Sequence, residues 1–167
     1  MKAFVNKIVV LRLLHYDMRS KILIREATIN DSDEIANLAK EIWKNNSISE
    51  LKKEFTESMA SVKACIYVFE DKDKRIKGFA QCNLRYDYVE GTKSSPVGFL
   101  EGIFITEEYR GKGIGKVLLS AAQSWAKENG CIEFACDCGI NNSISYNFHI
   151  HNGFKEVNRI VCFSKKI

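Results

Sequence analysis

Arg110-Gly-Lys-Gly-Ile-Gly115 lies between an apolar segment and an amphipathic one. The segment before it, Gly98-Phe-Leu-Glu-Gly-Ile-Phe-Ile105, is almost continuously apolar and predicts a strand. After it, apolar residues recur at helical spacing, namely Val117, Leu118, Ala121, Ala122 and Trp125. A strand, a glycine-rich turn and a helix in this order aim a helix N-terminus and several backbone N–H groups at one point. That arrangement predicts a phosphate-binding site.

The glycine-rich turn differs from the two common nucleotide-binding loops. It lacks the Gly-x-x-x-x-Gly-Lys-[Ser/Thr] pattern, and it is not a Gly-x-Gly-x-x-Gly run followed by an acidic ribose ligand. Gly113 and Gly115 would let a ligand approach the backbone closely, and Arg110, Lys112 and Lys116 add positive charge. The alternative is a plain glycine-rich turn, which the strand and helix on either side disfavour.

Length and composition fit one globular domain. The chain has 167 residues, of which 46% are hydrophobic and 28% charged. Its net charge of +4 suits a polyanionic small ligand as well as it suits nucleic acid, so charge excludes neither. The six cysteines lack the short paired spacing of secreted scaffolds, which favours a reducing cytosol. Residues 1–21 include a short apolar run interrupted by Arg12, neither a membrane span nor a convincing signal peptide. We expect an N-terminal extension there and assign it no function.

The remaining pattern predicts a single α/β domain over residues 22–167, with a mixed sheet. Asn30 or Asp31 is expected to cap a helix that carries Ile35, Leu38, Ala39 and Ile42 on one face. The other expected helices cover residues 49–59, the segment that ends near 129–130, and a short stretch from Asn142 or Ser143 to Gly153. The expected strands are 22–27, a hairpin of 64–70 with 76–86, 98–105, 132–136, and two more within 154–167.

Arg110-Gly-Lys-Gly-Ile-Gly115 fits Arg-x-x-Gly-x-Gly, and the chain thereby resembles the GCN5-related N-acetyltransferases. Three further segments, 88–103, 133–137 and 161–167, resemble one subgroup, the aminoglycoside 6′-N-acetyltransferases of the Acinetobacter-like chromosomal type. The resemblance covers about residues 22–167. It implies one twisted mixed sheet, splayed between two central parallel strands and flanked by helices. It also implies acetyl-coenzyme A as co-substrate, acetylation of an aminoglycoside 6′-amine as antibiotic resistance, a cytoplasmic location and a homodimer.

Two acidic residues are candidates for the acceptor site. Glu101 falls within an apolar strand, on the side of Phe99, Ile103 and Ile105 if alternation is regular, and an ordinary solvated carboxylate fits poorly there. A strand-edge or bulge position that points it to water is the alternative. Asp137 ends a strand expected to be parallel, where ligands bind, although a turn-forming Asp is equally consistent. The resemblance places substrate-binding acids at both positions. We therefore expect both to bind substrate ammonium groups and one to direct deprotonation.

The resemblance supplies further site residues. Trp43 and Tyr88 match the aromatic walls of the aminoglycoside site, although each is equally consistent with a core position. Asn158 stands where the subgroup has an acidic substrate contact, which puts the substrate range in doubt. His149 stands where the broader family often has a tyrosine that protonates the leaving thiolate, and a histidine can donate that proton. A coenzyme A thiol is acidic enough that no such donor is strictly required.

The expected cofactor contacts lie on the strand and the loop after it. The backbone of Phe104, Ile105 and Thr106 is expected to bind the pantetheine arm, and an N–H near Ile103 or Phe104 to polarise the thioester. The pyrophosphate is assigned to the loop and helix start, and the subgroup adds Asn142; these residues are Arg110, Gly111, Lys112, Gly113, Ile114, Gly115, Lys116, Val117 and Asn142.

A metal site and a covalent intermediate are both disfavoured. Cys136 and Cys138 share a strand face, but His149 and His151, two apart on a helix, point nearly opposite ways, so no zinc site is expected. No cysteine resembles an acyl-carrying nucleophile, which favours direct attack in a ternary complex. Two alternatives stay open: an acetyltransferase acting on a peptide amine or polyamine, and a non-catalytic acyl-coenzyme A-binding module. An RNA-binding role would rest on charge alone.

Overall fold

The computed structural model describes residues 15–17 and 22–167 of the chain. In that part of the chain, strands form one sheet in the order β1-β2-β3-β4-β5-β6. Neighbouring strands are antiparallel, except that β5 and β6 are parallel. The strands are β1 (His15–Asp17), β2 (Ile22–Glu26), β3 (Ala64–Glu70), β4 (Ile76–Arg85), β5 (Val97–Ile105) and β6 (Phe134–Cys136). The expected mixed α/β architecture is confirmed.

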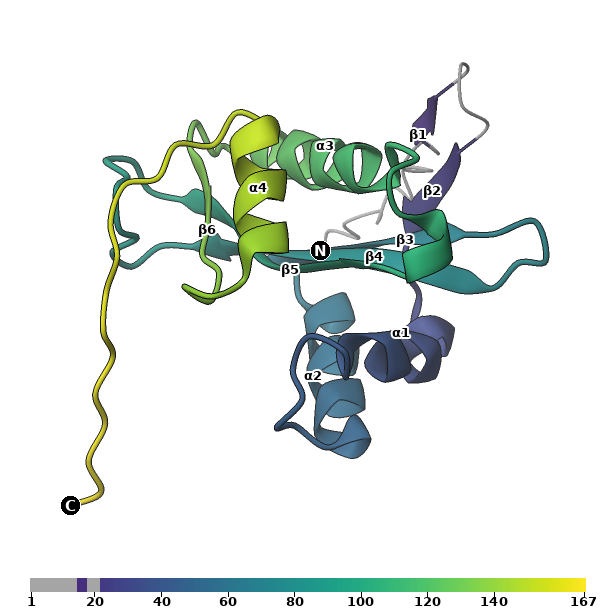
Figure 1. Ribbon diagram of the computed structural model, residues 1–167, viewed down its shortest axis with the longest axis horizontal. Coiled ribbons are helices and arrows are strands. Elements are labelled where there is room, and N and C mark those ends of the chain that lie inside the picture. Colours follow the sequence, from purple (N-terminus) through teal and green to yellow (C-terminus); the bar gives the residue numbers. More distant parts are fainter. Residues whose placement is uncertain (1–14, 18–21) are drawn as a thin grey trace, which may run out of the picture.

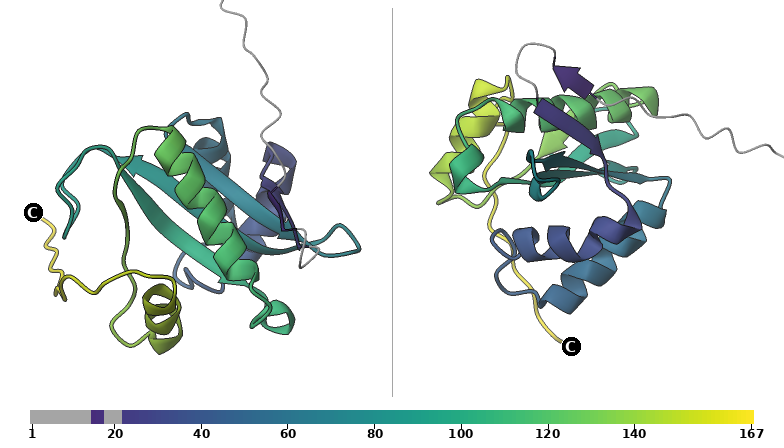
Figure 2. Two further views of the ribbon diagram at one scale, coloured as in Figure 1. Left: turned by 90° about the horizontal axis from the view of Figure 1, so that it is seen from above. Right: turned by 90° about the vertical axis from the view of Figure 1, so that its right-hand side faces the viewer.

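Helices cover both faces of the sheet (Figures 1 and 2). On one face lie α1 (Ser32–Ala39) and α2 (Ile48–Ala60), and on the other lie α3 (Ile114–Glu128) and α4 (Ser143–His151). Each helical layer encloses its own core: Leu118 and Trp125 pack beneath α3, whereas Ile35 and Phe55 pack between α1, α2 and the sheet. Within the described ranges, no helix combines the length and apolar character needed to cross a membrane.

The helix starts follow from local capping. Ser47 and Glu50 form a capping box at the start of α2, in which the Glu50 N–H donates to the Ser47 hydroxyl. Asn142 accepts from the Ser145 N–H at the start of α4. Asp31 is the N-cap residue of α1, but its side chain makes no cap hydrogen bond to this helix and accepts from Thr28 and Arg25 instead. Helix α3 begins after Gly113 with no side-chain cap. The first N–H groups of α3 therefore remain available to a ligand.

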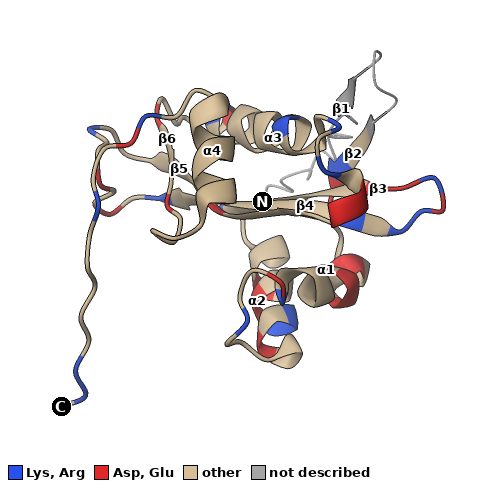
Figure 3. Cartoon of the chain, viewed as in Figure 1, with Lys and Arg blue, Asp and Glu red and all other residues tan. Residues whose placement is uncertain are grey.

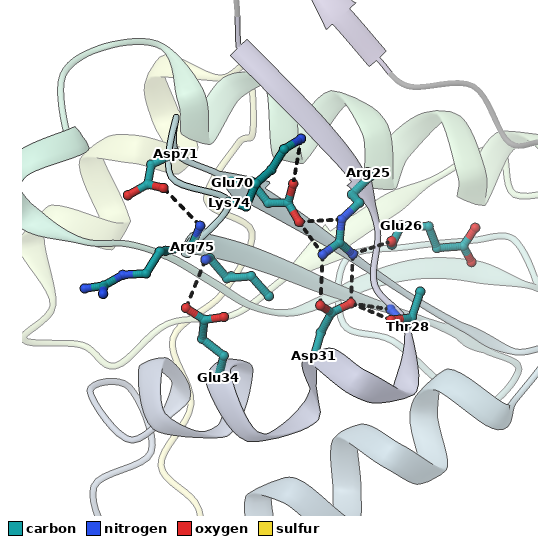
Figure 4. Close-up of polar contacts among 10 residues, drawn as sticks. Arg25, Glu26, Thr28, Asp31, Glu34, Glu70, Asp71, Lys74 and Arg75 are labelled. Carbon is teal, nitrogen blue, oxygen red and sulfur yellow. Dashed lines mark hydrogen bonds and ion pairs between the residues drawn. The ribbon is translucent and has the colours of Figure 1, made fainter.

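A polar cluster around Arg25 joins β2, the turn before α1 and the end of β3 (Figure 4). The Arg25 guanidinium on β2 donates to Asp31 Oδ2 at 2.7 Å and Oδ1 at 2.9 Å. Its Nε also donates to Glu70 Oε1 at 2.7 Å, at the end of β3. One arginine thus joins two strands and the turn that leads into α1.

Several sequence-based expectations were wrong in detail. Residues 154–167 form no strand. Phe154 packs against His149, whereas the end of the segment extends away from the body of the protein (Figure 1), and Val161 and Phe163 are exposed. None of the strands in the described ranges pairs with this segment. Ile42 lies beyond the end of α1 and is exposed, because the helix stops at Ala39. The strand expected from residue 132 begins at Phe134, which leaves Ile132 exposed.

The alternation expected around Glu101 was also wrong. The β4–β5 register shifts so that Gln81 pairs with Gly102 but Cys82 pairs with Leu100, which leaves Glu101 as an extra residue in β5. Such a bulge places two consecutive residues on one face. Glu101 and Gly102 therefore both lie on the α1–α2 side, while Ile103 and Ile105 pack into the core beneath α3.

Candidate active site

The sheet opens between β5 and β6. The parallel pair was expected at the centre of the sheet, but in the described ranges β6 is the edge strand, because residues 154–167 add no strand beyond it. The parallel ladder joins only Gly98–Leu100 to Phe134–Cys136. Beyond these pairs the second half of β5 continues without β6, and the chain after Cys136 turns toward α4. Glu101 and Asp137 each follow the last paired residue of their strand, so both carboxylates stand where the two strands separate.

Glu101 is held by polar neighbours on β4. Arg85 Nη2 lies 2.8 Å from Glu101 Oε2 and 3.0 Å from Oε1, and Arg85 Nε donates to Oε1 at 3.2 Å. Asn83 Nδ2 also donates to Oε1, at 3.1 Å. The Arg85 guanidinium stacks on the Phe99 ring, 3.3 Å from its centroid. Glu101 therefore points neither to open water nor into the apolar core.

Asp137 has different surroundings. It is exposed, and it accepts no hydrogen bond from the part of the chain that the structure describes. Its charge nevertheless contributes to raising the pKa of Cys136, and it opposes the lowering of the His149 pKa. Of the two expected ammonium ligands, Asp137 is thus the carboxylate without a neutralising partner.

His149 is buried beneath the opening, on α4. Its ring packs edge-on against Phe148 and Phe154, and Nδ1 lies 3.4 Å from Cys136 Sγ. Burial lowers the pKa of His149 and is the main reason that the pKa of Cys136 rises to about 12. Both groups are therefore neutral near pH 7. Cys136 Sγ and His149 Nδ1 share one hydrogen bond, whose direction follows the imidazole tautomer, and Nε2 is the ring nitrogen that this contact leaves unused.

The expected aromatic residues occupy unlike positions. Trp43 is half-buried against Phe55 and Phe79, with ring centroids 6.1 and 6.3 Å apart. It also covers the bulge, since a Cβ added to Gly102 would lie 2.6 Å from its ring. Trp43 is thus both a core residue and a neighbour of Glu101. Tyr88 is 81% exposed on the 86–96 loop, and its hydroxyl donates to Glu90 at 2.8 Å.

Asn158 lies in the extended C-terminal segment. It is exposed, and its side chain accepts from the Arg159 N–H. The residue before it, Val157, contacts the 86–96 loop, because a Cβ on Gly91 would lie 2.5 Å from Val157 Cγ2. No contact joins Asn158 to Glu101 or Asp137 within the described ranges.

The glycine-rich loop leads from β5 to α3. Gly111 and Gly113 have φ values of 72° and 81°, in the left-handed region that glycine adopts without strain. Arg110 fastens the loop to β5: its Nε donates to the Ile105 carbonyl at 2.9 Å, and its guanidinium lies over the Phe104 ring. The first turn of α3 contains no acidic residue, which favours an anion at its N-terminus.

Charge around this loop is mixed (Figure 3). Lys112 and Lys116 are exposed on the loop and on the first turn of α3, whereas Glu107 and Glu108 occupy the preceding helical turn. Gly115 lets α4 approach closely, since a Cβ there would lie 3.0 Å from the Phe148 ring. The glycine-rich loop thus follows the second half of β5 directly, and the Gly115–Phe148 contact brings α4, which Asn142 caps, against the start of α3.

Sequence reasoning missed several residues of this site. Asn83 and Arg85 alternate with apolar residues along β4, as Gln81 does. Polar residues two apart in a buried strand could have indicated a shared polar face. Phe148, which packs against Gly115, and Cys136 as the partner of His149 carry no comparable local pattern.

The strand–loop–helix unit at separated parallel strands defines an acyl-coenzyme A-dependent acetyltransferase fold. The model of the acetyltransferase (GNAT) family matches residues 32–154, and the chain belongs to this family. An aminoglycoside N(6′)-acetyltransferase type 1 of Stenotrophomonas maltophilia is 37% identical over 140 residues, which cover 84% of this chain and 90% of that protein. The corresponding protein of Acinetobacter haemolyticus is 34% identical over 142 residues, or 85% of this chain and 94% of its own length.

Solved structures agree with these relatives. AAC(6′)-Iy in complex with the bisubstrate analogue CoA-S-monomethyl-acetylneamine superposes with a TM-score of 0.82 at 32% identity, covering 87% of this chain and 99% of that chain. AAC(6′)-Ih from Acinetobacter baumannii gives a TM-score of 0.81 at 32% identity, with the same coverage. The resemblance inferred from the sequence is therefore confirmed.

Proposed function

We propose that the protein transfers the acetyl group of acetyl-coenzyme A to the 6′-amine of aminoglycoside antibiotics. The single observation that carries this proposal is the opening between β5 and β6, where Glu101 and Asp137 stand beside strand edges that lead to an uncapped helix N-terminus. The names of the relatives support the same acceptor. Carboxylates and aromatic faces suit a polycationic amino sugar.

Acetyl-coenzyme A is assigned to β5 and the N-terminus of α3. The backbone of Phe104, Ile105 and Thr106 lies beyond the point where β6 leaves β5, and we assign the pantetheine arm to it. The Thr106 N–H already donates to the Lys77 carbonyl and the Ile105 carbonyl accepts from Arg110, so the arm would use the other backbone groups of this segment. Residues 110–117 present the helix N-terminus to the pyrophosphate. The Asn142 side chain caps α4. We therefore assign the cofactor contact that was expected of Asn142 to the N-terminus of α4.

The acceptor is assigned to the α1–α2 side and the exposed loop. Glu101 and Asp137 bind ammonium groups, while Trp43 and Tyr88 offer ring faces to the sugar. The contact between Val157 and Gly91 holds the C-terminal segment against the 86–96 loop, and we assign Asn158 to the acceptor site on the basis of this contact. Because Asn158 is uncharged, it adds no attraction for a further ammonium group.

The reaction is a direct transfer in a ternary complex. The ammonium loses a proton, and the nitrogen lone pair then forms a C–N bond to the acetyl carbonyl carbon. The C–S bond breaks, its electron pair stays on the coenzyme A sulfur, and the nitrogen loses its second proton. His149 is neutral at pH 7 because burial lowers its pKa, so we assign it a hydrogen bond through Nε2 rather than delivery of a proton.

Coenzyme A thiol release with a panel of amines tests this function. The panel is kanamycin, tobramycin, an aminoglycoside with a 6′-hydroxyl, spermidine and an N-terminal peptide, with acetyl-coenzyme A alone as the background. Turnover restricted to the 6′-amino drugs is expected. Turnover of only the peptide or spermidine would support the alternative acceptor class, and binding without turnover would support a non-catalytic module.

We also infer a cytoplasmic homodimer. All six cysteines are free thiols, in keeping with a reducing compartment. The extended C-terminal segment exposes Ile160, Val161 and Phe163, which a second copy would cover. Light scattering after size-exclusion chromatography is expected to give twice the chain mass. A variant ending at residue 155 is expected to elute as a monomer.

A further inference from the structure

Arg85 places a permanent positive charge on one of the two acceptor-site carboxylates. Arginine stays protonated in proteins. Its side chain is 40% exposed and that of Glu101 is 22% exposed, so the pair borders solvent without being fully hydrated. Stacking on Phe99 and the two-nitrogen contact with Glu101 both fix the plane of the guanidinium.

This contact leaves Glu101 with an uneven set of hydrogen bonds. Oε1 accepts from Arg85 Nε, Arg85 Nη2 and Asn83 Nδ2, whereas Oε2 accepts only from Arg85 Nη2. A carboxylate oxygen can accept at least two hydrogen bonds, and Oε2 has only one donor. Oε2 is therefore the atom that can accept a further hydrogen bond from an amine.

Few other charged or titratable groups surround this carboxylate in the described ranges. From β4 come Arg85 and the uncharged Asn83, and from the chain between α1 and α2 comes the apolar Trp43 ring. Asp137 follows β6 at the same opening, and His149 is neutral and lies against Cys136, on the α3–α4 side of the sheet. On the 86–96 loop, Tyr88 and Glu90 bind each other.

The charge balance matters because the acceptor must lose a proton before it attacks. A neighbouring negative charge stabilises an ammonium, and a neighbouring positive charge favours the neutral amine. Two uncompensated carboxylates would bind the amine tightly in its unreactive form. With Arg85 in place, Glu101 contributes orientation while Asp137 remains the single uncompensated acid.

We propose that Arg85 is a positioning residue that sets the charge of the bound acceptor amine by neutralising Glu101. Glu101 then holds the amine through Oε2, and the amine is bound in a form that readily loses its proton. This inference rests on the proposed acetyltransfer and concerns the same site. It predicts that removing the Arg85 charge and removing the Glu101 charge shift the pH dependence of kcat in opposite directions.

The test measures KM and kcat between pH 6 and 9 for a 6′-amino aminoglycoside, in wild type, Arg85→Met, Arg85→Lys and Glu101→Gln. Arg85→Met keeps an apolar chain against Phe99 and removes the charge. We expect it to lower the KM for the amine, lower kcat at pH 7, and move the acidic limb of the kcat profile up by about 0.5–1 pH unit. Arg85→Lys keeps the charge, so its acidic limb should stay near that of wild type.

Glu101→Gln leaves Arg85 uncompensated and is expected to act in the reverse direction. Its KM should rise and its acidic limb should move to lower pH. The double variant that combines Arg85→Met with Glu101→Gln removes both charges. The acidic limb of its kcat profile should therefore return toward that of wild type. A role in local structure alone would raise KM and lower kcat in every variant with the limb unmoved, and this result would overturn the proposal. Equal profiles for Arg85→Met and Arg85→Lys would also overturn it.

Two controls separate this inference from the proposed function and from misfolding. If wild type acetylates a peptide or polyamine instead, the proposed function fails, and the same profiles are measured with that amine. The affinity for acetyl-coenzyme A, measured by calorimetry, should be unchanged in the Arg85 variants. If Arg85→Met does not fold, the opposite shift expected of Glu101→Gln decides the question.

Discussion

Ser94 donates both its backbone N–H and its hydroxyl to the same oxygen of Glu133, each at 2.6 Å. The Lys93 N–H donates to that oxygen as well, at 2.8 Å. Glu133 directly precedes β6, so its carboxylate ties the loop that carries Tyr88 to the strand that Asp137 follows. These bonds hold the pKa of Glu133 below its usual range, the Ser94 hydroxyl being the largest cause.

Glu133→Gln is expected to raise the KM for an aminoglycoside by about 3- to 10-fold, because a charge-assisted anchor of the loop is lost. The KM for acetyl-coenzyme A should stay constant, since the loop lies away from α3. Steady-state kinetics with each substrate varied in turn measures both values. Lys93→Ala is the matched control, because it keeps the backbone donor. Equal increases in both KM values would contradict this role.

Asp31→Asn is expected to destabilise the fold by about 1–2 kcal/mol at pH 7, a value reduced for solvent screening. The hydrogen bonds from Arg25 are the main reason that the pKa of Asp31 falls to about 2. A carboxylate with a lowered pKa stabilises the fold above its unfolded pKa of about 3.9 and loses this effect as pH falls toward 2. Urea unfolding at several pH values should therefore show the difference from wild type shrinking below pH 4.

The exposed Asp33 offers a control for this prediction. It pairs with Lys52 at the surface, with side chains 68% and 46% exposed. Asp33→Asn should change the free energy of unfolding by less than about 0.5 kcal/mol. A similar decrease in the free energy of unfolding in both variants would mean that the Arg25–Asp31 pair stabilises the fold no more than the exposed Asp33–Lys52 pair does.

Gly113→Ala is expected to destabilise the protein by about 1 kcal/mol and to weaken acetyl-coenzyme A binding. Nothing lies within 4 Å of an added Cβ, so the cost comes from the φ of 81° alone. Relief of that strain would reorient the first N–H groups of α3. Calorimetric titration and thermal unfolding measure the two effects. Gly139→Ala is the control, since it also meets nothing within 4 Å and its φ lies outside the left-handed region.

His149→Phe is expected to reduce kcat by less than about tenfold, whereas an essential proton donor would contribute at least about a hundredfold. Burial lowers the pKa of His149, so the unfolded chain takes up its proton first as pH falls below about 6.5. Wild type should therefore lose stability between pH 7 and 5.5, and His149→Phe should lose less. Melting temperatures at the two pH values test this, and a kcat loss above a hundredfold would restore the proton-donor role.

Local patterns were sufficient to predict most elements. The hairpin of β3 and β4, the helix after the glycine loop and the short helix from Asn142 all lie close to their expected bounds. Each depends on residues near one another in the chain: a charged turn, an apolar face at helical spacing, or a capping side chain. The C-terminal strands failed because alternation alone does not supply a partner strand.

The candidate site was only partly predictable. Asp137 was expected at the end of a parallel strand and Glu101 within an apolar strand, and the structure places both directly after the last paired residues of β5 and β6. Arg85 was not expected, because it lies 16 residues from Glu101 and its contact depends on which residues β4 and β5 place opposite each other. The bulge changed that register by one residue.

The sequence by itself determined the fold class, the glycine-rich loop between a strand and a helix, and the family. These depend on short-range periodicity and on glycines that permit particular backbone angles. Only the tertiary structure decided which face Glu101 occupies, that Arg85 neutralises it, and that His149 is buried against Cys136. Those facts depend on strand register and on burial, and both arise from packing between segments that are distant in the chain.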